Sequence, residues 1–301
     1  MLKKEEDTSA AKILKNFHDG FGWQIDPATG MHHHHTYFQD MDEVAVKYRY
    51  THELRFKPSY SGGGHYFLDA GCGGEPRSNL SEGFDVHLCL DLSIEGLKAA
   101  RDQLGGSGEY VVADLSYLPL KSGSFDGVLA SHCLYHVDKK KQKGAIEELY
   151  RVTKNTKFIL VLYSSRYNLI SMFHKIAAVG CKWWNVILHL VGLHVYPLPP
   201  YLVTRRQKTV DSTVEKTLPI LYSFAHNPTN LSREYPVADV SCLMSFSIYD
   251  TKLLEKLGLL GIGIRLFDFL ENRFPHAMRH VGKFTCIRIQ KRVDLQGFER
   301  R

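Results

Sequence analysis

Apolar positions gather into short runs, and the first three clear runs each lead into an aspartate. The runs at residues 66–68, 86–90 and 110–113 are followed by Asp69, Asp91 and Asp114. Between the second and third runs, residues 94–104 have helical spacing behind Ser93, a residue type that caps helices. This alternation predicts a parallel sheet with crossover helices, and the three acids would lie at one edge of it.

The loop after the first run is rich in glycine. Gly71, Gly73 and Gly74 follow Asp69 closely, and Pro76 suits the first turn of a helix that we expect just beyond. Glycines let backbone amides approach a ligand, and an acid about twenty residues further on can bind a ribose, which is the place of Asp91. A nicotinamide-binding loop needs a small residue where Pro76 stands, so a dehydrogenase is disfavoured.

Further elements are predicted on both sides of these runs. Upstream, an aromatic-rich segment with a helix over residues 40–54 is expected to cover the site as a cap. Downstream, we expect helices over residues 139–152 and 249–257, and strands over residues 158–163, around 264–269 and over 283–290.

The stretch from residue 66 to about residue 165 resembles the class I S-adenosylmethionine-dependent methyltransferases, in particular the type-11 small-molecule group. LDAGCGG at residues 68–74 resembles the first motif, and Asp91 the ribose-binding acid. ADL at residues 113–115 with LPL at 118–120 resembles the adenine-side segment, SFDGVL at 124–129 the fourth strand, and ELYRV at 148–152 the helix end before strand five. Glu75 departs from the pattern, because many members have a third glycine there.

The resemblance implies a Rossmann-like α/β fold. Its doubly wound, seven-stranded sheet would have an antiparallel last strand, an N-terminal helical cap and a helical insertion after strand five. The expected divisions are a cap at residues 1–60, a cofactor-binding core at 61–165, an aromatic-rich insertion or lid at 166–239, the C-terminal part of the core at 240–291 and a tail at 292–301.

The resemblance also implies the cofactor, S-adenosylmethionine, and the residues that bind it. Asp91 would accept both ribose hydroxyls, and Asp114 the adenine amine, although Asp114 can instead cap the turn before Ser116. The expected cofactor-binding residues are Asp69, Gly71, Gly73, Asp91, Leu92, Asp114, Leu115 and Ser131.

Three histidines are candidates for a catalytic base. His132 and His136 follow strand four, beside the reactive end of the cofactor in the family's fold, and His226 could arrive only if the insertion closes over the site. A histidine near neutral pKa can remove a proton from an acceptor, but packing is an open alternative for these residues. No set of metal-ligating groups follows strands four and five, so no catalytic metal is expected.

The acceptor is expected to be a small molecule. Nucleobase amines are methylated with an Asp/Asn-Pro-Pro-aromatic loop after strand four, whereas SHCL stands here at residues 131–134. The aromatic cap and insertion favour a small, lipid-like or natural-product acceptor over nucleic acid. We expect an enzyme that methylates oxygen by in-line displacement; the alternative is a noncatalytic methyltransferase-like binding module.

Composition adds limits to this interpretation. The 301 residues are 44% hydrophobic and 23% charged, with a net charge of +6 whose basic residues are scattered and favour solvated faces over nucleic-acid contacts. The six cysteines fall singly, which is typical of reduced cysteines, and the charged N-terminus lacks a secretory signal, so a cytoplasmic protein is expected. Oligomeric state does not follow from the sequence.

The composition of two further segments could indicate a metal site or a membrane span. Residues 32–35 are four consecutive histidines, for which a solvated loop is favoured over a metal site. The stretch at residues 176–195 approaches transmembrane length but is interrupted by Lys182, Asn185, His189 and His194, which favours a lid or docking hairpin over a span. Packing of Trp183 and Trp184 into the body and peripheral docking on a membrane remain alternatives to the lid.

Overall fold

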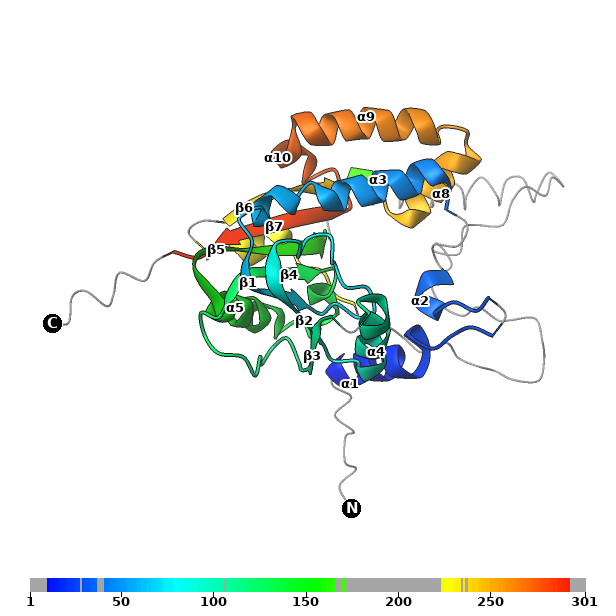
Figure 1. Ribbon diagram of the computed structural model, residues 1–301. Coiled ribbons are helices and arrows are strands. Elements are labelled where there is room, and N and C mark those ends of the chain that lie inside the picture. The colour runs from blue at the N-terminus through cyan, green and yellow to red at the C-terminus, as the bar shows by residue number, and fades with distance from the viewer. Residues whose placement is uncertain are drawn as a thin grey trace, which may run out of the picture.

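The centre of the molecule is a seven-stranded sheet with the strand order β3-β2-β1-β4-β5-β7-β6 (Figure 1). The computed structural model describes residues 10–27, 29–36, 41–105, 107–165, 169–170, 223–233, 235 and 238–292. Its strands are β1 (Gly64–Ala70), β2 (Phe84–Asp91), β3 (Glu109–Val112), β4 (Phe125–Ser131), β5 (Thr153–Ser164), β6 (Ala238–Met244) and β7 (Phe284–Gln290).

The strand directions confirm the predicted Rossmann-like sheet. The β1 strand pairs in parallel with β2 and β4, and β2 and β4 pair in parallel with β3 and β5. The last strand, β7, runs antiparallel between β5 and β6. The carboxyl ends of β1 to β5 therefore meet at one edge, where ligands bind in open α/β sheets.

Helices cover both faces of this sheet. On one face, α5 (Gln142–Val152) packs Ile146 and Leu149 against a core that includes Val128 and Val161. On the other face, α3 (Glu43–Leu54) and α9 (Leu260–Arg273) run side by side above β6 and β7 (Figure 1), and they share a second core with Phe67. Alternate residues of the inner strands point to these two cores, as the pleat requires.

Polar side chains cap the N-terminal ends of two helices. Ser93 caps α4 (Ile94–Gln103) by accepting from the Gly96 amide at 3.0 Å, as the sequence predicted. Ser247 and Asp250 form a reciprocal capping box at the start of α8 (Ile248–Lys256). The remaining α-helices of the described residues are α1 (Ala10–Phe17), α2 (His33–Thr36), α7 (Pro228–Ser232) and α10 (Pro275–Met278).

Two predicted elements are wrong. No helix follows Pro76, because the chain turns back to β2 and the Asp69 carboxylate accepts the Arg77 amide at 2.7 Å within a series of turns. The predicted strand around residues 264–269 belongs to the helix α9, and the strand that joins the sheet is β6. Residues 264–269 are a short apolar-rich run that is compatible with a strand or a helix, whereas Leu260 and Ile264 lie one helical turn apart and are both buried.

The predicted insertion lies mainly outside the described residues. Of residues 166–239, the structure describes 169–170, 223–233, 235 and the start of β6. Trp183, Trp184 and the interrupted apolar stretch are not among them, so the division into lid and core stays a prediction.

Candidate functional site: a cavity at the strand ends

A cavity of about 380 Å³ opens at the carboxyl edge of the sheet. This volume lies within the range of about 300 to 1,000 Å³ that is typical of small-molecule sites. Its lining is Ala10, Ala11, Leu14, Gly71, Asp91, Leu92, Ala113, Asp114, Leu115, Ser116, Cys133, His136, Val137, Asp138, Lys140 and Lys141. These residues come from α1 and from the segments that follow β1, β2, β3 and β4.

Gly71 has to be a glycine for two reasons. Its φ angle is +71°, in the left-handed region, and a Cβ atom there would lie 2.5 Å from the Cβ of Cys133. The Gly71 amide donates to the Leu90 carbonyl at 2.6 Å, which ties the end of β1 to β2. The loop can therefore bring its backbone to the cavity only without a side chain at this position.

Asp91 presents its carboxylate to the cavity with each oxygen already positioned. Oδ2 accepts from the Gly73 amide and Oδ1 from the Ser93 amide, both at 2.8 Å. Burial raises the pKa of Asp91, while these backbone hydrogen bonds act in the opposite direction. Because a carboxylate oxygen can accept more than one hydrogen bond, both oxygens can also accept from a vicinal diol.

The segment after β3 continues the cavity lining beside Asp91, where the Ala113 amide donates to the Asp91 carbonyl at 3.0 Å. Asp114 Oδ1 accepts from the Ser116 amide at 2.8 Å, so the turn-capping role that the sequence left open is present. Asp114 also lines the cavity, beside the largely buried Leu115. One acid thus closes the turn and contributes a polar group next to an apolar wall.

Three of the expected cofactor residues lie outside this lining. Asp69 is buried beneath the loop, where His87 Nε2 lies 3.4 Å from its Oδ2. Gly73 faces Trp23, because a Cβ there would lie 2.7 Å from the indole ring. The Ser131 hydroxyl is buried and has no hydrogen-bond partner among the described residues. Asp69 and Gly73 shape the loop from behind, while Gly71, Asp91, Leu92, Asp114 and Leu115 line the cavity.

Of the three candidate histidines, His136 alone lines the cavity. His132 lies behind it with a φ angle of +56°, and both of its ring nitrogens are buried without a hydrogen-bond partner among the described residues. Burial lowers the pKa of His132 well below the ordinary value, and the nearby arginines 49 and 77 lower it further. His226 is held elsewhere, with its amide donating to the Tyr163 hydroxyl at 2.8 Å.

The N-terminal segment supplies a wall that the sequence did not reveal. Ala10, Ala11 and Leu14 of α1 line the cavity. Asp19 accepts from the Ser93 hydroxyl at 2.5 Å and pairs with Lys15 at 2.6 Å, so it ties α1 to the start of α4. The apolar spacing of residues 10, 14 and 17 was the available signal, but the neighbouring charges obscured it.

Alternating charges connect the N-terminal helices to the glycine loop. Glu75 lies 3.0 Å from His35 and 3.5 Å from Arg77, and Arg77 lies 3.3 Å from Glu53 of α3. Burial would raise the pKa of Glu75, but the hydrogen bond from His35 and the charge of Arg77 lower it to about 2. The residue that replaces the family's third glycine is therefore an anchor for the N-terminal segment.

The predicted solvated loop at residues 32–35 is wrong. His33, His34 and His35 lie on the short helix α2, and His34 Nε2 lies 2.8 Å from His18 Nδ1. Burial lowers the pKa of His34 to about 4, so its ring is neutral at physiological pH. The run packs against Trp23 because its rings supply apolar faces as well as nitrogen atoms.

Comparison with known proteins identifies the core. Residues 68–161 match the model of the Methyltransferase domain family. The chain carries a class I S-adenosylmethionine-dependent methyltransferase domain. The first motif, Asp91 and the adenine-side segment of this methyltransferase all lie within the matched residues.

Relatives of the methyltransferase match part of its length. An uncharacterized protein of Methanocaldococcus jannaschii is 31% identical over 116 residues, 36% of this chain and 48% of that protein. A malonyl-[acyl-carrier protein] O-methyltransferase of Enterobacter lignolyticus is 38% identical over 89 residues, 29% of this chain and 34% of the relative. The chain thus spans less than half the length of these two curated relatives.

A solved S-adenosylmethionine-dependent methyltransferase from Archaeoglobus fulgidus has a TM-score of 0.44 with this structure and 15% sequence identity, covering 86% of this chain and 98% of the other. Among the described residues of the methyltransferase, no helix is both long and apolar enough to cross a membrane.

The cavity fits S-adenosylmethionine, the cofactor of this domain class. A purine nucleoside needs an acceptor for its ribose diol, a polar group for its amine and an apolar surface for its ring. Asp91, Asp114 and Leu115 provide these groups around one cavity. Gly71 keeps the loop backbone free of a side chain beside them.

Proposed function

We propose that this methyltransferase transfers a methyl group from S-adenosylmethionine to an oxygen atom of a small-molecule acceptor. The observation that carries the proposal is that one cavity is lined by Gly71, Asp91, Asp114 and His136, which follow or end four neighbouring strands. The proposed cofactor-binding groups and the candidate base therefore line the same cavity.

The cofactor supplies an electrophilic methyl group on a sulfonium centre when it is bound. The protein has to orient it and exclude water, for which proximity can contribute on the order of 7 to 11 kcal/mol. Asp91 would hold the ribose and Asp114 the adenine amine. Leu14 of α1 adds an apolar side chain to the lining of the cavity.

His136 is the group that we assign as the base. It lines the cavity, and an imidazole nitrogen within hydrogen-bond reach of an acceptor hydroxyl can take its proton as the methyl group arrives. His132 instead acts behind the site as a neutral, buried residue, in keeping with its lowered pKa. His226 keeps no role in this assignment, because it does not line the cavity and its Nε2 lies 3.2 Å from the Lys139 carbonyl oxygen.

Oxygen is favoured as the acceptor atom by the similarity to the malonyl-[acyl-carrier protein] O-methyltransferase. That similarity covers 29% of this chain. A lipid-like or natural-product acceptor under a lid formed by residues 166–239 remains part of the proposal. The aromatic residues of that insertion are what support it.

The test is a transfer assay with methyl-labelled S-adenosylmethionine and a panel of hydroxyl, carboxyl and amine acceptors. His136→Asn should lower kcat by about 10²- to 10⁴-fold while cofactor affinity stays unchanged, because a base acts on the acceptor alone. His65→Asn is the matched control, since His65 is exposed at the opposite end of β1. Label found on nitrogen, or equal rates in the two variants, would contradict the proposal.

A further inference from the structure

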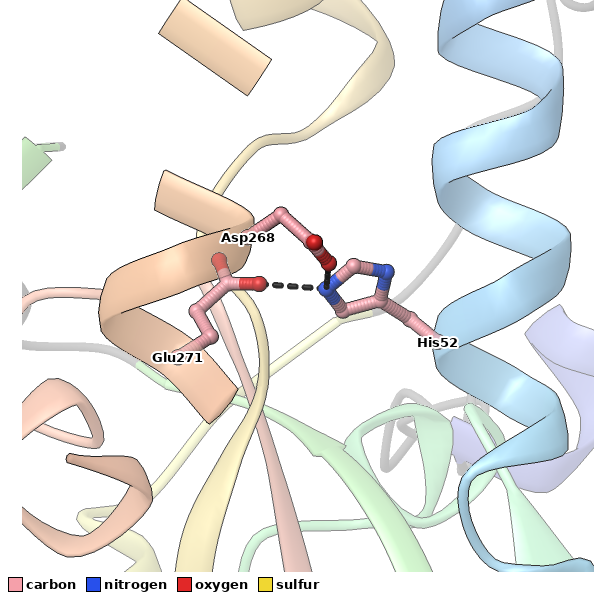
Figure 2. A group of neighbouring side chains, drawn as sticks. All are labelled: His52, Asp268 and Glu271. Atoms are coloured by element: carbon pink, nitrogen blue, oxygen red, sulfur yellow. Dashed lines mark hydrogen bonds and ion pairs between the residues drawn. The ribbon is translucent and has the colours of Figure 1, made fainter. Parts of the chain in front are cut away.

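A buried polar cluster joins α3 to α9 away from the cavity (Figure 2). His52 projects from α3, and Asp268 and Glu271 project toward its imidazole from α9. One ligand atom from each of the three residues lies within 4.8 Å of the other two. The side chains of His52 and Glu271 are fully buried, whereas that of Asp268 is 46% exposed. None of the three lines the methyltransferase cavity.

The imidazole of His52 is fixed in the orientation that a ligand requires. Its Nδ1 lies 2.6 Å from the Tyr48 carbonyl oxygen. A carbonyl can only accept, so Nδ1 carries a hydrogen and Nε2 is turned toward the two carboxylates. Metal-bound histidines almost always donate their other ring N–H in this way, often to a backbone carbonyl.

The carboxylate of Glu271 is also held in a fixed orientation. Its Oε1 accepts from the Tyr48 hydroxyl and from the Ser245 amide, both at 2.7 Å. Its Oε2 is thereby directed to His52. Such hydrogen bonds to the far oxygen hold a ligating carboxylate in place without occupying its ligand atom.

Asp268 completes the set at a distance that suits a metal. Its Oδ1 lies 3.6 Å from His52 Nε2. Two ligands at about 2.1 Å from a tetrahedral zinc ion are about 3.4 Å apart, so these atoms need little movement to share one ion. Arg55 donates to the same oxygen at 2.7 Å and lies 3.8 Å from Glu271 Oε2, so an ion bound by Oδ1 would take the place of this Arg55 contact.

We propose that His52, Asp268 and Glu271 bind a divalent first-row transition-metal ion such as Zn²⁺, which fastens the helix α3 to α9. Three protein ligands from nitrogen and oxygen, with water in the fourth position, are a common zinc set. The half-exposed Asp268 gives the ion and its water a path from solvent. The site acts on stability, and it is independent of the proposed methyl transfer.

The same groups can instead hold a proton between His52 and Glu271 without any metal. The two arrangements differ in their response to added zinc, because an ion that binds the folded chain alone raises its melting temperature. Full-length protein treated with chelator is therefore melted with and without Zn²⁺. The binding isotherm is measured by calorimetry on the same samples.

Asp268→Asn is the decisive variant, since a half-exposed position tolerates substitution. Asp239→Asn is the matched control, because Asp239 and His276 form an exposed histidine–carboxylate pair at 3.3 Å. Zinc should raise the melting temperature of the wild type and of Asp239→Asn by several degrees, and that of Asp268→Asn much less. Affinity at this site should fall at least tenfold in Asp268→Asn.

The consecutive histidines of residues 32–35 could also bind zinc, so the measurements are repeated in a protein that carries His33→Gln and His35→Gln. The metal site on α3 and α9 should persist there and should still be lost with Asp268→Asn. No stabilisation of the wild type by zinc, or equal stabilisation of Asp268→Asn, would overturn the proposal and leave a metal-free network.

Discussion

The cavity has two walls of different origin. One wall, the strand wall, consists of the segments at the ends of β1, β2 and β3. Each of these strand ends places one residue of the wall, namely Gly71, Asp91 and Asp114. The other wall, the helix wall, is α1, which is tied to the start of α4 by the hydrogen bond between Asp19 and Ser93, two residues distant in sequence. In the function that we propose, the first wall supplies the affinity for the nucleotide, and the second determines how closed the cavity is.

The largest expected effect concerns the strand wall. Gly71→Ala places a Cβ atom 2.5 Å from Cys133 at a φ angle of +71°, so the loop must shift away from the cavity. A left-handed residue costs about 1 to 2 kcal/mol and overpacking a similar amount, so S-adenosylmethionine affinity should fall by at least about thirtyfold. Calorimetry checks this.

Gly105→Ala is the control for that variant. Gly105 has a φ angle of +59°, but nothing lies within 4 Å of a Cβ atom added there. It should bind the cofactor like the wild type, whereas unchanged affinity in Gly71→Ala would show that the loop does not form the cavity wall.

The helix wall should give a smaller effect. Asp19→Asn weakens the contacts of Asp19 with Lys15 and Ser93, and α1 should then separate from α4 more often. A charge-assisted hydrogen bond contributes about 1.5 to 3 kcal/mol, and only part of this free energy would be lost from cofactor binding. We therefore expect about threefold weaker binding. Asp102→Asn, on the exposed side of α4, should change nothing. A loss as large as that in Gly71→Ala would erase the distinction between the walls.

The smallest effect is the pH dependence of the contact between Glu75 and His35, which ties α2 to the loop. The contact with Glu75 raises the pKa of His35, so its contribution to stability is full below about pH 6.5 and is lost as pH rises through the raised pKa. The pKa of Glu75 is about 2, below its ordinary value of 4.5, so its contribution is lost as pH falls from about 4.5.

The free energy of unfolding should therefore be higher for the wild type than for Glu75→Gln. The difference should be largest, about 0.5 kcal/mol, near about pH 5.5 and smaller near about pH 9. Urea unfolding at the two pH values measures it. A difference that is the same at both would exclude His35 as the titrating partner.

The strand wall could be predicted from the sequence because its signals are local. A buried run, a glycine and an acid fix the place of Asp91 within a few residues, and the order of the runs then fixes the sheet. The strand expected around residues 264–269 was wrong because a short apolar-rich run is compatible with both a strand and a helix, and the burial of Leu260 and Ile264 shows the helical period.

The helix wall and the cluster of α3 and α9 could not be predicted in this way. Asp19 meets Ser93, and His52 meets Glu271, only after the sheet has formed. Single polar residues on amphipathic helices carry no local sign of such partners. Gly73 and Asp69 show the same limit, since the motif indicates that they matter but not that they act from behind the loop.

Calorimetry with S-adenosylmethionine on the wild type, Asp91→Ala and Asp85→Ala tests the account most directly. Asp85 is the matched control, because it lies on the same strand at the end away from the cavity and is exposed. The wild type and Asp85→Ala should bind one cofactor per chain. Asp91→Ala should bind at least about tenfold more weakly, which corresponds to about 1.4 kcal/mol for the lost carboxylate contacts. Absence of binding by the wild type, or unchanged affinity in Asp91→Ala, would contradict the assignment of this cavity as the cofactor site.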